Sequence, residues 1–258
     1  MPANPYDLVG SAAHTYAQVR PTYPTEFLSD LVTSAARAKQ KSISQVQVCD
    51  IGAGTGKLTA QLAATGAEMW AVEPAADMRA EFMRELPDFP STQLLATTAE
   101  RTELSTAAFD LLTYGQCWHW LTAPEASAEA ARILRPGGQI AIFFNQLDVR
   151  QGWVKRLSRI MRSGDVQRLD RPPQLELPGG ETAFTALQLS YTVHIEPMTI
   201  EQIFALGTTR ASWLRSTPEN RQRMRENLRW YLEDHLGHAA PGRIGIPYIS
   251  ICWRAQRK

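Results

Sequence analysis

Three glycines at alternate positions follow a short apolar run, and an acidic residue stands directly before them. Residues 48–59 read VCDIGAGTGKLT, so that Asp50 precedes Gly52, Gly54 and Gly56. Glycine tolerates positive φ and lets a ligand approach the backbone closely. The segment therefore predicts a strand, a tight ligand-binding turn and a helix start. About twenty residues on, a second strand-like run ends at Glu73, which is placed to hold the ribose hydroxyls of an adenosine-containing ligand.

The spacing separates three ligand classes. A Walker loop would need a glycine at Ile51 and a serine or threonine at Leu58, so a nucleoside triphosphate does not fit. A dinucleotide fingerprint counted from Gly52 would need a glycine at Lys57, and a pyrophosphate would be repelled by Asp50. S-adenosylmethionine carries a sulfonium and an ammonium and no phosphate, so an acidic strand end suits it.

Residues 50–56 (DIGAGTG) resemble the first motif of the class I S-adenosylmethionine-dependent methyltransferases. Further segments resemble that family's later motifs in the family's order: 71–74 (AVEP), 98–100 (TAE), 109–114 (FDLLTY) and 134–139 (LRPGGQ). The opening segment, 16–24, is similar to the start of the trans-aconitate methyltransferase-like small-molecule subgroup. The resemblance covers roughly the first 145 residues well and the remainder loosely.

This resemblance implies S-adenosyl-L-methionine as the methyl donor and S-adenosyl-L-homocysteine as the product. An N-terminal arm that folds over the donor would bring in Arg20, either to pair with the methionine carboxylate or simply to form a surface ion pair. Met78 would pack on the adenine, although a helical methionine can equally fill a core. The expected donor-binding residues are Tyr16, Arg20, Asp50, Gly52, Ala53, Gly54, Gly56, Glu73, Pro74, Met78, Ala99, Glu100 and Gln116.

An aromatic cluster, residues 116–121 (QCWHWL), follows the fourth predicted strand, where donor and acceptor would meet. Trp118, His119 and Trp120 could wall an acceptor pocket, because aromatic faces favour the positive sulfonium and its methyl group. His119 is the candidate general base, with a pKa ordinarily near neutrality. The alternative is that the tryptophans only pack and His119 only forms a hydrogen bond. A carboxylate acceptor is already ionised and needs orientation rather than a base.

A basic run lies at 210–229. Arg210, Trp213 and Arg215 precede a predicted helix and are the expected acceptor contacts, suited to an acidic small molecule. The arginines at 221–229 read as the solvated face of that helix, with contacts to phosphates as the alternative.

Short β-rich runs alternate with helical ones, which predicts an α/β fold with right-handed crossovers. Strands are expected at 46–50, 68–72, 93–97, 109–114 and 139–145, and helices at 57–65, 75–86 and 124–134. Later segments predict helices at 149–163, 200–206 and 218–236, strands at 187–195 and 245–253, and a loop at 171–180. Together with the family resemblance this indicates a Rossmann-like, doubly wound, mostly parallel seven-stranded sheet with an antiparallel edge hairpin.

The chain is expected to form a single methyltransferase domain over residues 1–258, with an N-terminal helical arm (1–45), a cofactor-binding core (46–145), and cap helices with edge strands (146–258). A net charge of +1 gives no general attraction to nucleic acid or membrane. Three widely spaced cysteines show no metal-ligand or disulfide spacing, and the N-terminus lacks the features of a secretory signal, so no metal and a cytoplasmic location are expected.

The sequence thus favours a monomeric or homodimeric enzyme that methylates a small molecule, with a carboxylate oxygen as the preferred acceptor. Methylation of RNA or protein, a non-catalytic regulatory protein that binds the donor, and an NAD-dependent oxidoreductase are the alternatives, the last disfavoured by the positions of Asp50 and Gly56.

Overall fold

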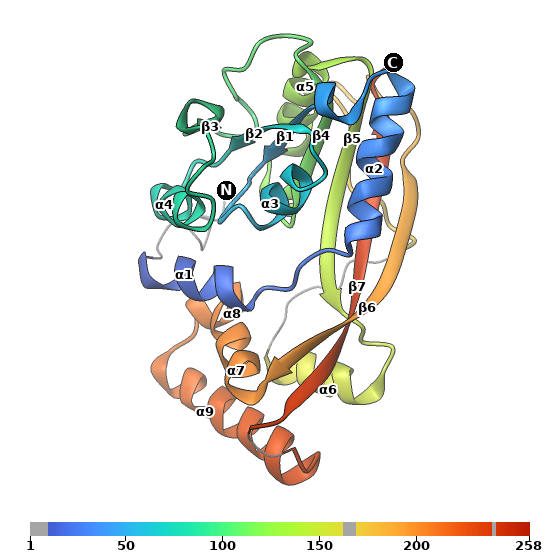
Figure 1. Ribbon diagram of the computed structural model, residues 1–258. Helices are drawn as coiled ribbons and strands as arrows, with labels where there is room; N and C mark the ends of the chain where they lie inside the picture. Colours follow the sequence, from blue (N-terminus) through green and yellow to red (C-terminus); the bar gives the residue numbers. More distant parts are fainter. Residues whose placement is uncertain (1–9, 162–168, 239–240) are drawn as a thin grey trace. The chain divides into compact units, whose positions relative to one another are not determined.

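A computed structural model describes residues 10–161, 169–238 and 241–258 (Figure 1). The first residues of the predicted arm and the last residues of the predicted helix at 149–163 lie outside these ranges. The first half contains α1 (Gly10–Val19), α2 (Thr25–Ala38), β1 (Gln47–Ile51), α3 (Lys57–Ala63), β2 (Glu68–Val72), α4 (Ala76–Glu85), β3 (Leu94–Leu95), β4 (Phe109–Gly115), α5 (Ala123–Ile133) and β5 (Leu134–Leu147). The second half contains α6 (Gly152–Ile160), β6 (Gln188–Thr199), α7 (Ile200–Thr208), α8 (Ala211–Leu214), α9 (Pro218–Arg229) and β7 (Arg243–Gln256). Short helical turns lie at Ile43–Gln45, Ser91–Gln93 and Trp118–Trp120, and a π-helix at Trp230–His235.

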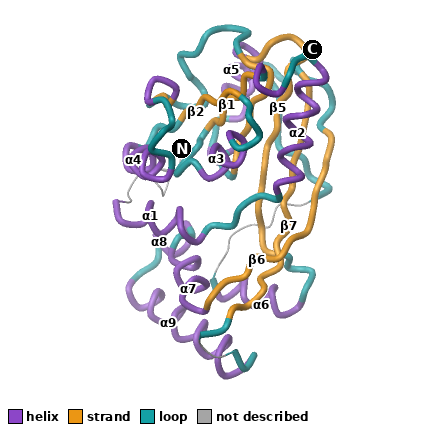
Figure 2. Tube along the Cα trace, in the orientation of Figure 1, coloured by secondary structure: helices purple, strands orange, loops and turns teal. Residues whose placement is uncertain are grey.

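The sheet confirms the predicted fold class. Its strand order is β3-β2-β1-β4-β5-β7-β6, and the pairs β2–β3, β1–β2, β1–β4 and β4–β5 are parallel. The last two strands form the antiparallel edge with β5 (Figures 1 and 2). The order of the strands changes direction at β1: strands β2 and β3 lie on one side of it, and β4 and β5 lie on the other. Open α/β sheets bind their ligands at such a switch point.

Two compact units can be distinguished within the chain. Unit 1 comprises Met1–Pro21, Asn145–Gln167 and Val193–Ile249, and unit 2 comprises Thr22–Phe144, Arg168–Thr192 and Ser250–Lys258. Strands β5, β6 and β7 contribute residues to both units.

Unit 2 contains the Rossmann-like core. Helix α2 begins after Pro24 and buries Leu28, Leu31 and Val32, whose helical spacing gives one apolar stripe. These residues pack in one core cluster with α3 and with the central strands β1, β4 and β5. Burial of this stripe positions α3, and with it the loop that precedes α3.

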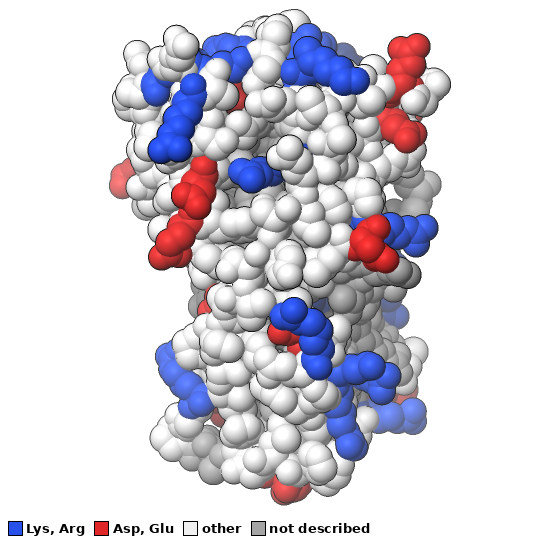
Figure 3. All heavy atoms as spheres, turned by 90° about the vertical axis from the view of Figure 1, so that its right-hand side faces the viewer, with Lys and Arg blue, Asp and Glu red and all other residues white. Residues whose placement is uncertain are grey.

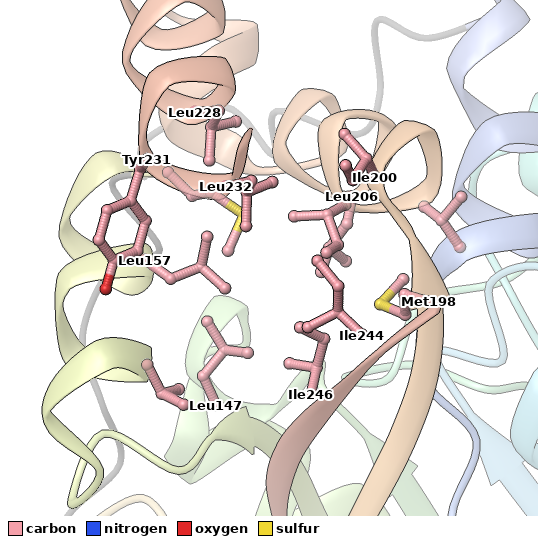
Figure 4. Packing of buried hydrophobic residues seen from close by; sticks show 14 of the residues in the cluster. Leu147, Leu157, Met198, Ile200, Leu206, Leu228, Tyr231, Leu232, Ile244 and Ile246 are labelled. Carbon is pink, nitrogen blue, oxygen red and sulfur yellow. The ribbon is translucent and has the colours of Figure 1, made fainter. Parts of the chain in front are cut away.

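Unit 1 has its own apolar core (Figure 4). Leu157 from α6, Leu228 from α9 and Ile246 from β7 are fully buried in it. The predicted helix at 218–236 changes type within its length: α9 ends at Arg229 and a π-helix continues from Trp230 to His235. Among the described residues, no helix is long and apolar enough to cross a membrane.

The structure corrects three details of the predicted elements. β3 has only two residues instead of the five expected at 93–97. β5 begins at Leu134 rather than 139. Its register with β4 shifts at residues 135–138, so the predicted turn forms a bulge within the strand, with Gly137 at φ +70°. Helix α8 was not predicted, because four residues are too few to show a helical period.

Candidate functional site

The glycine loop joins β1 to α3 in unit 2, and all three of its glycines have positive φ. The φ angles are +70° at Gly52, +58° at Gly54 and +81° at Gly56. A Cβ atom at Gly52 would lie 2.8 Å from Cys117 Sγ, and one at Gly56 would lie 2.8 Å from Phe82 Cδ2, whereas a Cβ at Gly54 would meet nothing within 4 Å. Gly52 and Gly56 are thus required for packing as well as conformation, and the loop is open to a ligand at Gly54.

Glu73 holds the glycine loop from the end of β2. Its Oε2 accepts a hydrogen bond from the backbone N–H of Gly54 (2.8 Å), and its Oε1 accepts one from Ala75 N–H (2.8 Å). The residue is only 7% exposed. Each carboxylate oxygen can accept two hydrogen bonds, so ribose binding is compatible with these contacts.

Asp50 is buried, and its carboxylate is held by two hydroxyl groups. Oδ2 accepts from Thr59 Oγ1 at 2.7 Å and Oδ1 accepts from Thr113 Oγ1 at 2.9 Å. Burial raises the pKa of Asp50 to about 6, against the opposing effect of the two hydroxyl donors. Asp50 therefore joins β1 to α3 and β4, and it influences a ligand through its charge and by positioning the loop. Sequence reasoning did not find Thr59 and Thr113, because only the register of β1 with β4 and the start of α3 bring them to Asp50.

The segment after β4 lies against the glycine loop. Gln116 has φ +61°, which is uncommon for a residue with a side chain, and Cys117 Sγ donates to Ile51 O at 3.2 Å. Burial raises the pKa of the Cys117 thiol well above its ordinary value, so this cysteine is not a thiolate nucleophile. The fold thus places Gln116 beside the turn that the sequence predicts to bind the donor.

The three aromatic residues of the cluster have different environments. Trp118 is buried, packs edge-on against Tyr114 with ring centroids 4.8 Å apart, and donates from Nε1 to Gln174 O at 3.0 Å. His119 is exposed, and its ring lies 4.7 Å from that of Trp120, which is half-buried. His119 and Trp120 are therefore accessible to a ligand, whereas Trp118 supports the turn from below.

The residues expected near the adenine lie around α4 and the start of α5. Met78 is buried in α4, and Pro74 O accepts from Arg79 Nη1 at 2.7 Å. Ala99 is buried, and Glu100 Oε1 accepts from Thr122 N–H at 3.0 Å, immediately before α5. Ala53 packs in a small apolar cluster with Ala71 and Phe82.

In unit 1, the end of α1 is joined to the end of α7. The guanidinium of Arg20 lies 4.7 Å from the ring centre of Tyr16, donates from Nε to Thr209 Oγ1 at 3.0 Å, and donates from Nη2 to Thr209 O at 2.8 Å. Thr209 is 2% exposed. Arg20 is thus held in a fixed orientation at the end of α1.

The charges of Arg20 and Arg210 both affect the pKa of the same buried phenol, that of Tyr248 in β7. Burial raises the pKa of Tyr248, and the positive charges of Arg210 and Arg20 oppose that rise. The ring of His194 stacks on Tyr248 with centroids 5.8 Å apart. The structure therefore brings together in unit 1 one arginine predicted for the donor and one predicted for the acceptor. The sequence did not indicate a role for Tyr248, because it lies within an otherwise apolar predicted strand.

The other two residues predicted for the acceptor lie in and after α8. Trp213 is buried, and the guanidinium groups of Arg221 and Arg225 lie 5.5 Å and 5.2 Å from its ring centre. Arg215 is exposed. In the part of the chain that the structure describes, no group of three or more histidine, cysteine or acidic residues could hold a metal ion.

Comparison with known proteins agrees with this geometry. Residues 49–142 match the family described as methyltransferase domain. An uncharacterized methyltransferase of Mycobacterium tuberculosis is 34% identical over 95% of this chain and 94% of its own length. An uncharacterized methyltransferase of Schizosaccharomyces pombe is 28% identical over 83% of this chain and 82% of its own length.

Solved structures of lower identity share the fold. A candidate type II methyltransferase from Anaeromyxobacter dehalogenans has a TM-score of 0.59 at 20% identity, covering 92% of this chain and 97% of its own. A candidate methyltransferase of an antibiotic biosynthesis pathway from Anabaena variabilis has a TM-score of 0.54 at 18% identity, covering 86% and 96%. The match to the methyltransferase domain family and the 34% identity to the Mycobacterium tuberculosis methyltransferase, together with the glycine loop, the acidic end of β2 and the sheet order, establish that the chain belongs to the class I S-adenosylmethionine-dependent methyltransferases.

Proposed function

We propose that this methyltransferase transfers the methyl group of S-adenosylmethionine to a carboxylate oxygen of a small organic acid. The observation that carries the proposal is that Arg20 is hydrogen-bonded to Thr209, the residue directly before Arg210, so that two arginines from distant parts of the chain come to one place in unit 1. Guanidinium groups bind carboxylates through paired charge-assisted hydrogen bonds, and a fixed pair of them selects an anionic ligand. The relative from Anabaena is described as part of an antibiotic pathway, which is in keeping with a small-molecule acceptor.

The donor would be held in unit 2. The open side of Gly54 leaves room for the ligand beside the loop, and Glu73, which already accepts a hydrogen bond from Gly54 N–H, would accept further ones from ribose hydroxyls. Asp50 provides negative charge under the loop, which favours the cationic end of the donor. Gln116 lies near the same turn and would contact the methionine part. The residues present thus fit the donor, with the further contacts expected from Ala53, Gly52, Gly56, Pro74, Met78, Ala99 and Glu100.

When bound, S-adenosylmethionine supplies an electrophilic methyl group on sulfur: an acceptor oxygen bonds to the methyl carbon while the electron pair of the breaking C–S bond stays on sulfur. The protein's contribution is alignment of the two reactants and exclusion of water. A carboxylate is ionised near pH 7, so no residue has to remove a proton. His119 would act as a general base only for an acceptor that carries a proton on the attacking atom, such as a phenol.

The test is a turnover assay in which S-adenosylhomocysteine is measured with matched acceptors: dicarboxylic acids, their methyl esters, phenols, RNA and a protein extract. We expect turnover with free acids that the fully esterified compounds do not support. Turnover only with phenols, RNA or protein would refute the carboxylate proposal, and donor binding without turnover on any acceptor would favour the regulatory alternative.

Binding of the acid can be tested apart from turnover with Arg210→Gln. The variant should raise the acceptor KM about tenfold, as expected for one lost charge-assisted contact, while donor affinity by calorimetry stays unchanged. An unchanged KM would remove Arg210 from the acceptor site.

A further inference from the structure

Helices α6 and α9 of unit 1 enclose a groove of about 660 Å³. Its polar lining consists of Lys155, Arg156 and Arg159 from α6 together with Asn220, Arg223 and Asn227 from α9. Lys155 and Arg159 are four residues apart on one helix, and Arg223 and Asn227 are four apart on the other, so each pair projects from one helix face. Among the residues that the structure describes, no carboxylate lines the groove.

Within the described ranges, the four cations of this groove have no acidic partners, in contrast to other arginines of the unit. Arg150 pairs with Asp148 at 2.7 Å, and Arg229 lies 4.0 Å from Glu233. By contrast, the side chains of Lys155, Arg159 and Arg223 make no hydrogen bond or ion pair with any residue in the described ranges. Four like charges that line one concavity repel one another, and a bound anion would relieve that repulsion.

The fourth cation, Arg156, is oriented by aromatic rings instead of by a carboxylate. Its guanidinium lies 5.2 Å from the ring centre of Trp230 and 5.3 Å from that of Tyr231. His235 stacks on both rings within the π-helix, at 5.3 Å and 5.4 Å. Cation–π contacts fix the plane of a guanidinium and leave its N–H edge available to a ligand.

The walls of the groove are rigidly connected. Tyr231 is buried, and its hydroxyl donates to Trp153 O in α6 at 2.9 Å. Val154, Leu157 and Leu228 place the inner faces of α6 and α9 in the same apolar core, as Figure 4 shows for Leu157, Leu228 and Tyr231. The cations therefore project from a preformed frame, which reduces the entropy cost of binding an anion.

We propose that the groove between α6 and α9 binds the phosphate groups of a small molecule that carries two or more of them. Arginine forks and lysine ammonium groups are the side chains that recognise phosphate oxygens, and the two asparagines add neutral donors. The volume is that of a small-molecule site. On the face shown in Figure 3, basic and acidic side chains both lie among uncharged ones, and several of the basic side chains lie close together.

The probe is inorganic tripolyphosphate, titrated into the full-length protein by calorimetry, with ATP and a single-stranded oligonucleotide in parallel. We expect saturable binding of tripolyphosphate at one site per chain, weakened about tenfold by Arg159→Gln and by Arg223→Gln. ATP that binds more tightly than tripolyphosphate would indicate that a nucleoside contributes, and equal affinities would indicate that the phosphates alone are recognised.

Arg225→Gln is the matched control, because it removes the same charge from α9 at a position that does not line the groove. Equal weakening by Arg225→Gln, or no saturable binding of tripolyphosphate, would overturn the proposal. Much tighter binding of the oligonucleotide would overturn the small-molecule assignment. S-adenosylhomocysteine affinity, measured on the same variants, should stay unchanged, so a failure of this proposal is distinguishable from a failure of the proposed reaction.

Discussion

Replacement of Glu73 by alanine tests the assignment of the donor site most directly. The carboxylate accepts hydrogen bonds from Gly54 N–H and Ala75 N–H, both at 2.8 Å, and is 7% exposed. Glu73→Ala would leave both donors without their acceptor and would remove the group that is assigned to the ribose. Its effects on folding and on ligand binding therefore have to be measured separately.

The expected magnitudes follow from the number of contacts. A hydrogen bond to a charged group contributes about 1.5–3 kcal/mol, so loss of the ribose contact should weaken S-adenosylmethionine binding by roughly 10- to 150-fold. Loss of the two backbone contacts should lower the free energy of unfolding by about 1–3 kcal/mol, since water can replace part of the lost hydrogen bonding. Glu73→Gln keeps one acceptor oxygen and should fall between the wild type and the alanine variant.

The assays are calorimetric titration with S-adenosylmethionine and S-adenosylhomocysteine, and urea unfolding without ligand. Glu68→Ala is the control on the same strand, because Glu68 is exposed and bonds to Gln47 Nε2 at 2.5 Å. Unchanged donor affinity in a folded Glu73→Ala protein would refute the ribose assignment. A loss of affinity that Glu68→Ala reproduces would show that β2, rather than Glu73, is responsible.

Three further predictions concern the core of unit 2. Asp50 has a pKa raised from 3.8 to about 6, so the folded protein holds an extra proton between these values; stability should fall by up to about 3 kcal/mol as pH rises through that range, and urea unfolding of Asp50→Asn should lack this contribution. Gly56→Ala should lower the free energy of unfolding by about 1–3 kcal/mol, since φ is +81° and the new Cβ would meet Phe82, and an unaltered urea midpoint would contradict the conformation. Asp110→Asn should lower the free energy of unfolding by about 3 kcal/mol, because the buried carboxylate pairs with Lys41 at 2.7 Å and with Arg135 at 2.9 Å. Urea unfolding at high salt should still show this difference, because a buried ion pair is screened little.

The sequence by itself determined the local elements of the donor site. Alternating glycines after an apolar run have few conformations available other than a tight turn with positive φ, and all three glycines of the loop adopt it. The alternation of strand and helix patterns likewise led to the parallel sheet, because parallel strands need crossover connections and these connections have one hand. Such features depend on backbone sterics and on periodicity within a dozen residues, which the sequence shows directly.

Only the tertiary structure decided which side chains meet. The carboxylate of Asp50 is held by Thr59 and Thr113, which depends on the register of β1 with β4. Arg20, Arg210 and Tyr248 come from three distant parts of the chain, and the sequence held no local pattern linking them. The groove between α6 and α9 could not be predicted either, because the sequence of a basic helix face does not show whether that face is solvated or faces a second basic helix. Pairings of this kind are set by the packing of whole elements, whose energy is shared among many residues and is recorded in no single segment.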